Sequence, residues 1–254
     1  MSISFIQVLK AEFQKTKNIW GLTLSLLGPL AVLLILIIGF INQAETATNE
    51  VNPWINFAKY TFQFFFFLYP LFAALAAFLL SNIEHKNRGF KQIFTLPAPK
   101  IYFYGSKVLI LLFWIFSSIV FAGIVLYLSG QLLGWIVPAY GFHEYNIVPA
   151  SYVFLVRLYI TLLSIIAIHF FLSLYWDNFI VTVGSAVFLL ILGLIMYGNW
   201  KYAYLFPYSY SIQHWMEYNQ GNTQIWTRES WISLFYALTF FSAGYLLISK
   251  KNIT

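Results

Sequence analysis

Two ionisable residues, Arg157 and His169, lie inside one long apolar run of the sequence, Tyr152–Tyr175. An ionisable side chain in such a run is expected to serve a transport path, a relay or a polar contact between helices. Thr161 and Ser164 follow Arg157 at i+4 and i+7, which places a polar stripe on one helical face. Arg157, Thr161, Ser164 and His169 are therefore the candidate path or gating residues.

Two interpretations of Arg157 are open. The residue lies close to the end of its run, so its side chain can reach the membrane surface and act only as an anchor. If the stripe instead faces the helix bundle, as its hydroxylic neighbours favour, the guanidinium can attract an anionic group of a substrate or lipid, or pair with an outer-loop acid such as Glu144 or Glu217. His169 lies about 120° further around an ideal helix. We therefore expect His169 to join Ser173 in hydrogen bonds between helices, away from Arg157.

A second candidate for a functional role is the segment Asn82–Lys107, "NIEHKNRGFKQIFTLPAPKIYFYGSK". Phe90, Ile93 and Phe94 recur at i, i+3 and i+4, so they share one face of a short amphipathic helix, which Pro97 ends. Such an apolar face can insert into a groove of a partner protein. The alternative is a basic loop that only fixes topology, a role that requires no pair of phenylalanines.

Motifs for catalysis are missing from the sequence. It has no Gly–Lys dipeptide of a phosphate-binding loop, no HExxH zinc helix and no cysteine, and its carboxylates are scattered. The chain is therefore expected to have no enzymatic site, no metal site and no cofactor of its own.

Composition defines the class of protein. Of the 254 residues, 61% are hydrophobic and 9% are charged, whereas soluble domains carry about 25% charged residues. So few charges exclude both a soluble globular domain and a disordered chain. The net charge is +6, but the basic residues flank apolar runs, which indicates a lipid bilayer and not nucleic acid as the partner.

Six apolar runs are long enough to cross a membrane, which takes about 20 residues. They predict an all-α polytopic membrane protein with one transmembrane domain over residues 1–254. The predicted spans are residues 20–41, 60–81, 108–128, 152–175, 179–198 and 231–248.

Basic residues predict the orientation. An even number of spans places both termini on one side, and that side carries most of the lysines and arginines, which mark the cytoplasmic face. We therefore expect a bacterial cytoplasmic membrane protein with both termini in the cytoplasm. The residues on this side are Lys10, Lys15, Lys17, Lys86, Arg88, Lys91, Lys100, Lys107, Lys250 and Lys251; the other side has Lys59, Lys201 and Arg228.

The N-terminal segment Ser4–Asn18 predicts a helix in the cytoplasmic membrane interface, either a simple anchor or an elbow that moves during a transport cycle. We expect Ile6, Leu9 and Phe13 on one side, and Lys10, Gln14 and Lys17 on the opposite side near anionic lipid headgroups. Near the other end of the chain, the aromatic segment Asn199–Ser230 predicts either an interfacial belt or a lid over an exit path.

The layout of the whole chain resembles the membrane-spanning permeases of type-2 ABC exporters, especially the small subunits of lantibiotic-immunity and bacitracin-type exporters. The shared features are the "VLKAEFQKTKN" start, six spans, a charged first cytoplasmic loop and the aromatic "LFPYSYSI" segment. In this family a glutamate ends span two, and a Leu–Pro pair and a lysine follow before span three. Here these residues would be Glu84, Leu96, Pro97 and Lys107.

The resemblance implies a mechanism. Two permease subunits, identical or paired, would form the path, while separate ATPase subunits hold ATP and Mg and press on a coupling segment with Glu84, Phe90, Ile93, Phe94 and Pro97. Antimicrobial peptides and other amphipathic molecules are the implied substrates. Two other functions are open: a membrane scaffold or assembly subunit without transport activity, and an ion-coupled transporter that uses Arg157 and His169 as its charged path.

Overall fold

The computed structural model describes residues 3–17, 20–46, 51–86 and 98–250, and within these ranges the chain is helical and has no strand. This confirms the all-helical prediction. The α-helices are α1 (Phe5–Thr16), α2 (Trp20–Asn42), α3 (Pro53–Lys86), α5 (Lys100–Ile136), α6 (Pro149–Tyr175), α7 (Ser185–Asn199), α8 (Tyr210–Asn219) and α9 (Arg228–Lys250). Shorter helical turns are η1 (Ala44–Thr46), η2 (Pro138–Tyr140), η3 (Ile180–Gly184), η4 (Ala203–Leu205) and η5 (Pro207–Ser209).

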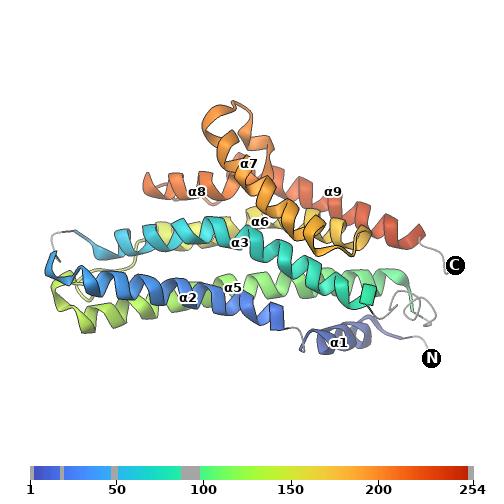
Figure 1. Ribbon diagram of the computed structural model, residues 1–254, viewed down its shortest axis with the longest axis horizontal. Helices are drawn as coiled ribbons and strands as arrows, with labels where there is room; N and C mark the ends of the chain where they lie inside the picture. The colour runs from blue at the N-terminus through green and yellow to red at the C-terminus, as the bar shows by residue number, and fades with distance from the viewer. Residues whose placement is uncertain (1–2, 18–19, 47–50, 87–97, 251–254) are drawn as a thin grey trace.

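Four long helices, α2, α3, α5 and α6, run side by side along the long axis of the molecule (Figure 1). Helix α9 packs along α6, and α7 crosses this layer at an angle. Helix α1 and the last turn of α9 lie at the same end of the bundle. The two ends of the described chain therefore lie at one end of the bundle.

Five helical segments are long and apolar enough to cross a membrane: Pro53–His85, Lys100–Ile136, Pro149–Tyr175, Ile180–Asn199 and Arg228–Lys250. They match five of the six predicted spans. The remaining predicted span, residues 20–41, corresponds to α2. Its apolar stretch in the described chain, Leu26–Asn42, is shorter than a full crossing. Helices α3 and α5 have 34 and 37 residues and extend well past their predicted spans, because hydropathy marks the apolar part of a helix and not its ends.

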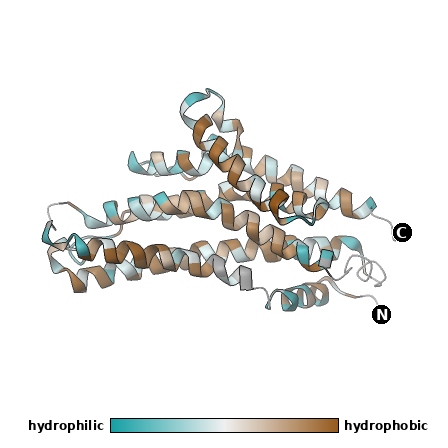
Figure 2. Cartoon of the chain, in the orientation of Figure 1, coloured by the Kyte–Doolittle hydropathy of each residue, from teal (hydrophilic) through white to brown (hydrophobic). Residues whose placement is uncertain are grey.

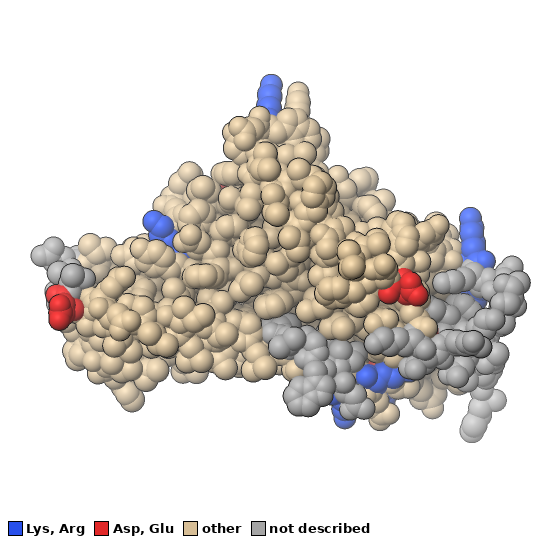
Figure 3. Space-filling view, in the orientation of Figure 1, with Lys and Arg blue, Asp and Glu red and all other residues tan. Residues whose placement is uncertain are grey.

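The surface agrees with a membrane setting. Hydrophobic residues cover the middle of the long helices, and hydrophilic residues gather at the helix ends and on α1 (Figure 2). On the face drawn in Figure 3, uncharged atoms cover most of the surface, and charged side chains form only small patches. Large exposed apolar residues on α5 include Phe113, Phe116 and Ile124, which is favourable only against lipid or another protein.

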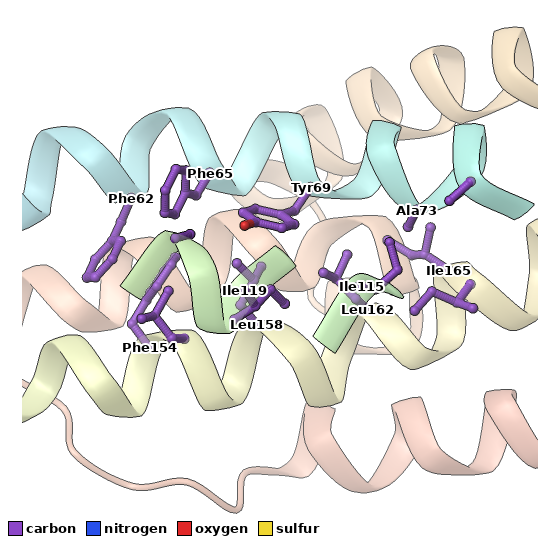
Figure 4. Packing of buried hydrophobic residues seen from close by; sticks show 14 of the residues in the cluster. Phe62, Phe65, Tyr69, Ala73, Ile115, Ile119, Phe154, Leu158, Leu162 and Ile165 are labelled. Atoms are coloured by element: carbon purple, nitrogen blue, oxygen red, sulfur yellow. The ribbon is translucent and has the colours of Figure 1, made fainter. Parts of the chain in front are cut away.

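The core lies between α3, α5 and α6 (Figure 4). Phe62 of α3 stacks on Phe154 of α6 with their ring centroids 4.0 Å apart, and the hydroxyl of Tyr69 donates to the carbonyl oxygen of Ser118 at 3.1 Å. Ala73 and Ala77 are fully buried on α3, one turn apart. Because lipid is as apolar as these side chains, close packing at small residues and buried hydrogen bonds stabilise such a bundle.

The N-terminal helix differs from its predicted orientation. A capping box of Ser4 and Gln7 starts α1, and the buried side of the helix is Val8, Glu12 and Thr16. Lys10, Gln14 and Lys17 do not lie opposite Leu9 and Phe13, because all five line one groove against α5. The prediction placed the two lysines and Gln14 on the side opposite the apolar residues, although adjacent sequence positions lie only about 100° apart on a helix.

The aromatic segment after α7 folds back onto the bundle. Helix α8 packs against both α3 and α6, and Tyr210 and Tyr218 are buried. The indole nitrogen of Trp215 donates to the carbonyl oxygen of Lys59 at 3.1 Å. This part of the segment therefore contributes to the protein interior and is more than a belt of surface aromatics.

Candidate functional site

Four charged side chains from three helices meet at the end of the bundle where α1 lies. Lys107 of α5 donates to Glu12 of α1 at 2.6 Å and to Glu84 of α3 at 3.0 Å. Lys15 of α1 contacts the same two carboxylates, at 2.6 Å for Glu12 and 2.9 Å for Glu84. We call Glu12, Lys15, Glu84 and Lys107 the ion cluster. It joins α1 to the end of α3 and the start of α5.

Three members of the ion cluster are removed from solvent. The side chains of Glu12, Glu84 and Lys107 are 2–3% exposed, whereas that of Lys15 is 36% exposed. Isolated buried charges are costly, but two carboxylates alternate here with two ammonium groups, so each charge has two opposite neighbours. Burial lowers the pKa of Lys15, yet its hydrogen bonds to Glu12 and Glu84 outweigh this, and the net pKa is raised.

The ion cluster flanks the predicted coupling segment. Of the five coupling residues, the structure describes only Glu84, and it places Glu84 in the ion cluster. Phe90, Ile93, Phe94 and Pro97 lie outside the described residues. Lys107 had been singled out by the family resemblance, whereas Glu12 and Lys15 had been missed as site residues. Their signal in the sequence is an acid at i and a lysine at i+3 in an otherwise basic segment.

Arg157 faces the bundle interior. Its side chain is 2% exposed and pairs with Glu217 of α8, one of the two acids expected from the sequence. Glu217 also accepts hydrogen bonds from Gln213 and Asn222, both at 3.3 Å. An arginine that only anchors the helix at the membrane surface would be exposed, so the structure favours the bundle-facing interpretation.

His214 is a second buried ionisable residue of α8, and sequence reasoning missed it. It is 1% exposed, and neither ring nitrogen has a hydrogen-bond partner in the described chain. Burial lowers its pKa well below the ordinary value, and the nearby Arg157 charge adds to this effect. The shift favours the neutral imidazole, and in the described chain the pair of Arg157 and Glu217 is the charged contact between α6 and α8.

Thr161 and Ser164 mark the contact between α6 and α9. The Thr161 hydroxyl donates to the carbonyl oxygen of Arg157 at 2.9 Å, and that of Ser164 donates to the carbonyl of Thr161 at 2.8 Å. Ser233 of α9 bridges the two helices, because its hydroxyl donates to the carbonyl oxygen of Ile160 at 2.9 Å and accepts from the amide of Ser164 at 3.2 Å. The hydroxyl of Ser233 therefore holds the two helix backbones close together.

His169 belongs to another contact, as the helical geometry predicted. Its Nε2 lies 2.6 Å from the hydroxyl oxygen of Tyr208 in η5. Ser173 hydrogen-bonds Ser81 of α3 at 2.7 Å. Both residues therefore link helices, but to different partners. The four candidate path residues do not form one site. In the described part of the chain, no group of His, Asp and Glu side chains is arranged to hold a metal ion.

The helical bundle of the described chain has five segments long and apolar enough to cross a membrane, and a short N-terminal helix is tied to it by buried charges. These features define a polytopic membrane protein of the permease type. The chain belongs to the ABC-2 family of transporter proteins, whose family model matches residues 8–193. This confirms the resemblance seen in the sequence. Membership in this family indicates a membrane protein of the permease type.

A relative of known name agrees with this assignment. The chain is 27% identical over 145 residues to the bacitracin transport permease protein BCRB of Bacillus licheniformis. The match covers 55% of this chain and 64% of the relative, so the chain spans less than two thirds of that protein. No solved structure matches the chain.

Proposed function

We propose that this protein is the membrane subunit of an ATP-binding cassette exporter, that it forms the substrate path, and that a separate ATPase subunit drives it with ATP and Mg. The family match over residues 8–193 carries the proposal. It is supported by a sequence without a phosphate-binding loop, which fits a partner that supplies the ATPase activity. A second permease copy or a paralogue would complete the path.

The coupling mechanism that we propose runs through the ion cluster. Residues 87–97 connect the end of α3 to the start of α5, and Phe90, Ile93 and Phe94 would dock in a groove of the ATPase. Glu84 and Lys107 stand on the two sides of this connection, and both contact Glu12 of α1 or its partner Lys15. A push on the connection would therefore move α1, α3 and α5 together.

Our proposed gate lies in the first half of α6, at Arg157. Arg157 pairs with Glu217 and so links α6 to α8, and α8 packs against α3 and α6. Separation of Arg157 from Glu217 would release α8 and open an exit. Thr161, Ser164 and His169 would act as positioning residues, because their contacts hold α6 against α9 and η5.

The substrate class that we propose is an antimicrobial peptide or another amphipathic molecule. The support is the relative named as a bacitracin transport permease. The described chain also presents a largely apolar surface on α5 and α7, which suits a substrate taken from the membrane. We place the protein in a bacterial cytoplasmic membrane with six spans and both termini in the cytoplasm.

Co-purification tests the proposed function. The protein and a candidate ABC ATPase would be expressed together, extracted in mild detergent and captured by a tag on the permease. We expect the ATPase to co-elute and its activity to respond to the permease. Phe90→Ala with Phe94→Ala should release the ATPase while membrane insertion is unchanged. Normal assembly and transport in this double variant would rule out the docking role.

A further inference from the structure

A groove of about 600 Å³ lies between α1 and the start of α5. Its apolar wall consists of Leu9 and Phe13 of α1 and Leu109, Ile110 and Phe113 of α5. The rings of Phe13 and Phe113 meet edge to face with centroids 6.3 Å apart. The groove is of the size of small-molecule sites, about 300–1,000 Å³, and its wall suits a hydrocarbon chain.

The polar edge of the same groove is basic. Lys10, Gln14 and Lys17 line it, and they recur at i, i+4 and i+7, so they form one stripe. Lys10 and Lys17 are about 10 Å apart along the helix axis, a spacing at which two long side chains can converge on one phosphate. Gln14 stands between them and offers an amide donor.

The charges of α1 are sorted between its two sides. Glu12, the acid of this helix, is buried in the ion cluster with Lys15 and Lys107, and on an ideal helix it lies about 160° from Lys10. Within the described chain, neither Lys10 nor Lys17 forms an ion pair, and both are exposed. The groove therefore has positive charge without a carboxylate to neutralise it.

We propose that this groove binds one anionic glycerophospholipid of the adjacent leaflet, with an acyl chain against Leu9, Leu109 and Phe113 and the phosphate between Lys10 and Lys17. The charge and the apolar wall together select this occupant. The proposal rests on the proposed membrane placement of α1, but it does not need the ATPase. The lipid would contact the helix that carries Glu12, so it would stabilise the α1 position that the ion cluster fixes.

Native mass spectrometry of the full-length protein in detergent tests this site. The delipidated protein is titrated with phosphatidylglycerol and with phosphatidylcholine that have identical acyl chains. We expect one tightly retained phosphatidylglycerol and weaker binding of phosphatidylcholine. Lys10→Gln with Lys17→Gln should weaken phosphatidylglycerol binding by about 10- to 30-fold, since each lysine near an anionic surface contributes roughly a factor of five. The charge-matched control, Lys59→Gln with Lys201→Gln, should bind like the wild type.

A second variant tests the apolar wall without changing charge. Leu109→Trp fills the groove at an exposed position, so it should reduce the binding of both lipids while the protein stays folded.

Equal retention of the two lipids by the wild type, or wild-type phosphatidylglycerol binding by the double lysine variant, would overturn the proposal. So would a Leu109→Trp protein that keeps its lipid and loses a permease dimer, because the groove would then hold a second copy. Lipid binding with no ATPase association would overturn the proposed function alone.

Discussion

Lys107 and Glu12 are 95 residues apart in the sequence, yet the ammonium nitrogen of Lys107 lies 2.6 Å from a carboxylate oxygen of Glu12. Both side chains are almost fully buried, at 3% and 2% exposed. A short N-terminal helix is thus attached to the bundle by buried charges in addition to apolar contacts such as that of Val8 with Phe103. Such an attachment is directional, because it holds only while the four charges keep their arrangement.

The first prediction concerns the ion cluster. Glu12→Gln leaves Lys107 and Lys15 with one shared carboxylate, and breaking a buried pair from one side typically costs about 3–5 kcal/mol. We expect a clear drop in the thermal unfolding midpoint in detergent and a loss of transport. Glu45→Gln, which removes an exposed acid, is the control and should change neither. An unfolding midpoint equal to the wild type would refute a stabilising role for the ion cluster.

The second prediction compares the two partners at the proposed gate. Arg157 is 2% exposed, whereas Glu217 is 20% exposed and keeps Gln213 and Asn222 as partners when Arg157 is removed. Glu217→Gln should therefore destabilise the protein more than Arg157→Gln, because it leaves a buried guanidinium without its counter-ion. The double variant should cost less than the sum of the single variants. Thermal unfolding of the wild type, the two single variants and the double variant completes a double-mutant cycle. Additive changes in stability would disprove the pairing.

The functional series at Arg157 follows from the same pair. If the charge between α6 and α8 controls the exit, Arg157→Lys, Arg157→Gln and Arg157→Glu should lower transport in that order at equal expression, since lysine keeps the charge and glutamate repels Glu217. Efflux of the substrate or resistance to it is the measurement. Wild-type transport in the Arg157→Glu variant would leave Arg157 with an anchoring role only.

The sequence predicted the all-helical class, five of the spans and the family, because each depends on local hydropathy and composition over a long window. It also predicted that Arg157 and His169 lie in different contacts, since helical geometry alone separates them. The family resemblance drew attention to Glu84 and Lys107. The sequence did not show that Glu12 joins them, because the faces of single helices do not reveal which distant segment they meet.

The burial of His214 and the side of α1 that its basic stripe occupies could not be predicted from the sequence for similar reasons. His214 lies in a polar, aromatic segment with no apolar run to mark it as buried, so its burial becomes visible only when α8 packs against α3 and α6. The sequence pattern places Lys10, Gln14 and Lys17 on the wrong side of α1, because it assumes that charged residues lie opposite the apolar face. Long basic side chains commonly border apolar surfaces.

His214 leads to a prediction of pH dependence. Burial and the nearby Arg157 hold the pKa of His214 well below its ordinary value, so the unfolded state binds a proton more readily than the folded state. The stability from this residue is complete above about pH 6.5 and falls as the pH drops below that value, by at most about 1.4 kcal/mol per pH unit. His214→Gln should flatten the fall in the unfolding midpoint between pH 7 and pH 5, while the exposed-site control His143→Gln should not. Identical pH profiles for wild type and His214→Gln would disprove this linkage.

The orientation can be checked with single cysteines, because the natural sequence has none. We expect cysteines at Asn49 and Asn222 to react with a membrane-impermeant maleimide from outside the cell, and a cysteine at Asn87 to react only after the membrane is opened. Asn49 and Asn222 lie in predicted outer segments, and Asn87 lies in the predicted coupling segment. Labelling of position 87 in intact cells would invert the topology and remove the proposed docking of the ATPase there.

The last prediction concerns the contact between α7 and η5, which holds the partner of His169. A Cβ atom on Gly193 would lie 2.5 Å from the carbonyl oxygen of Tyr208, a backbone atom that has no side-chain freedom to move aside. Gly193→Ala should therefore shift η5 and stretch the 2.6 Å contact between Tyr208 and His169, at a cost of about 1–3 kcal/mol. Gly198 stands on the same helix with open space around it, so Gly198→Ala should be neutral or slightly stabilising, since alanine favours helix. Thermal unfolding in detergent separates the two outcomes: equal midpoints for the two variants would show that α7 and η5 do not pack this closely.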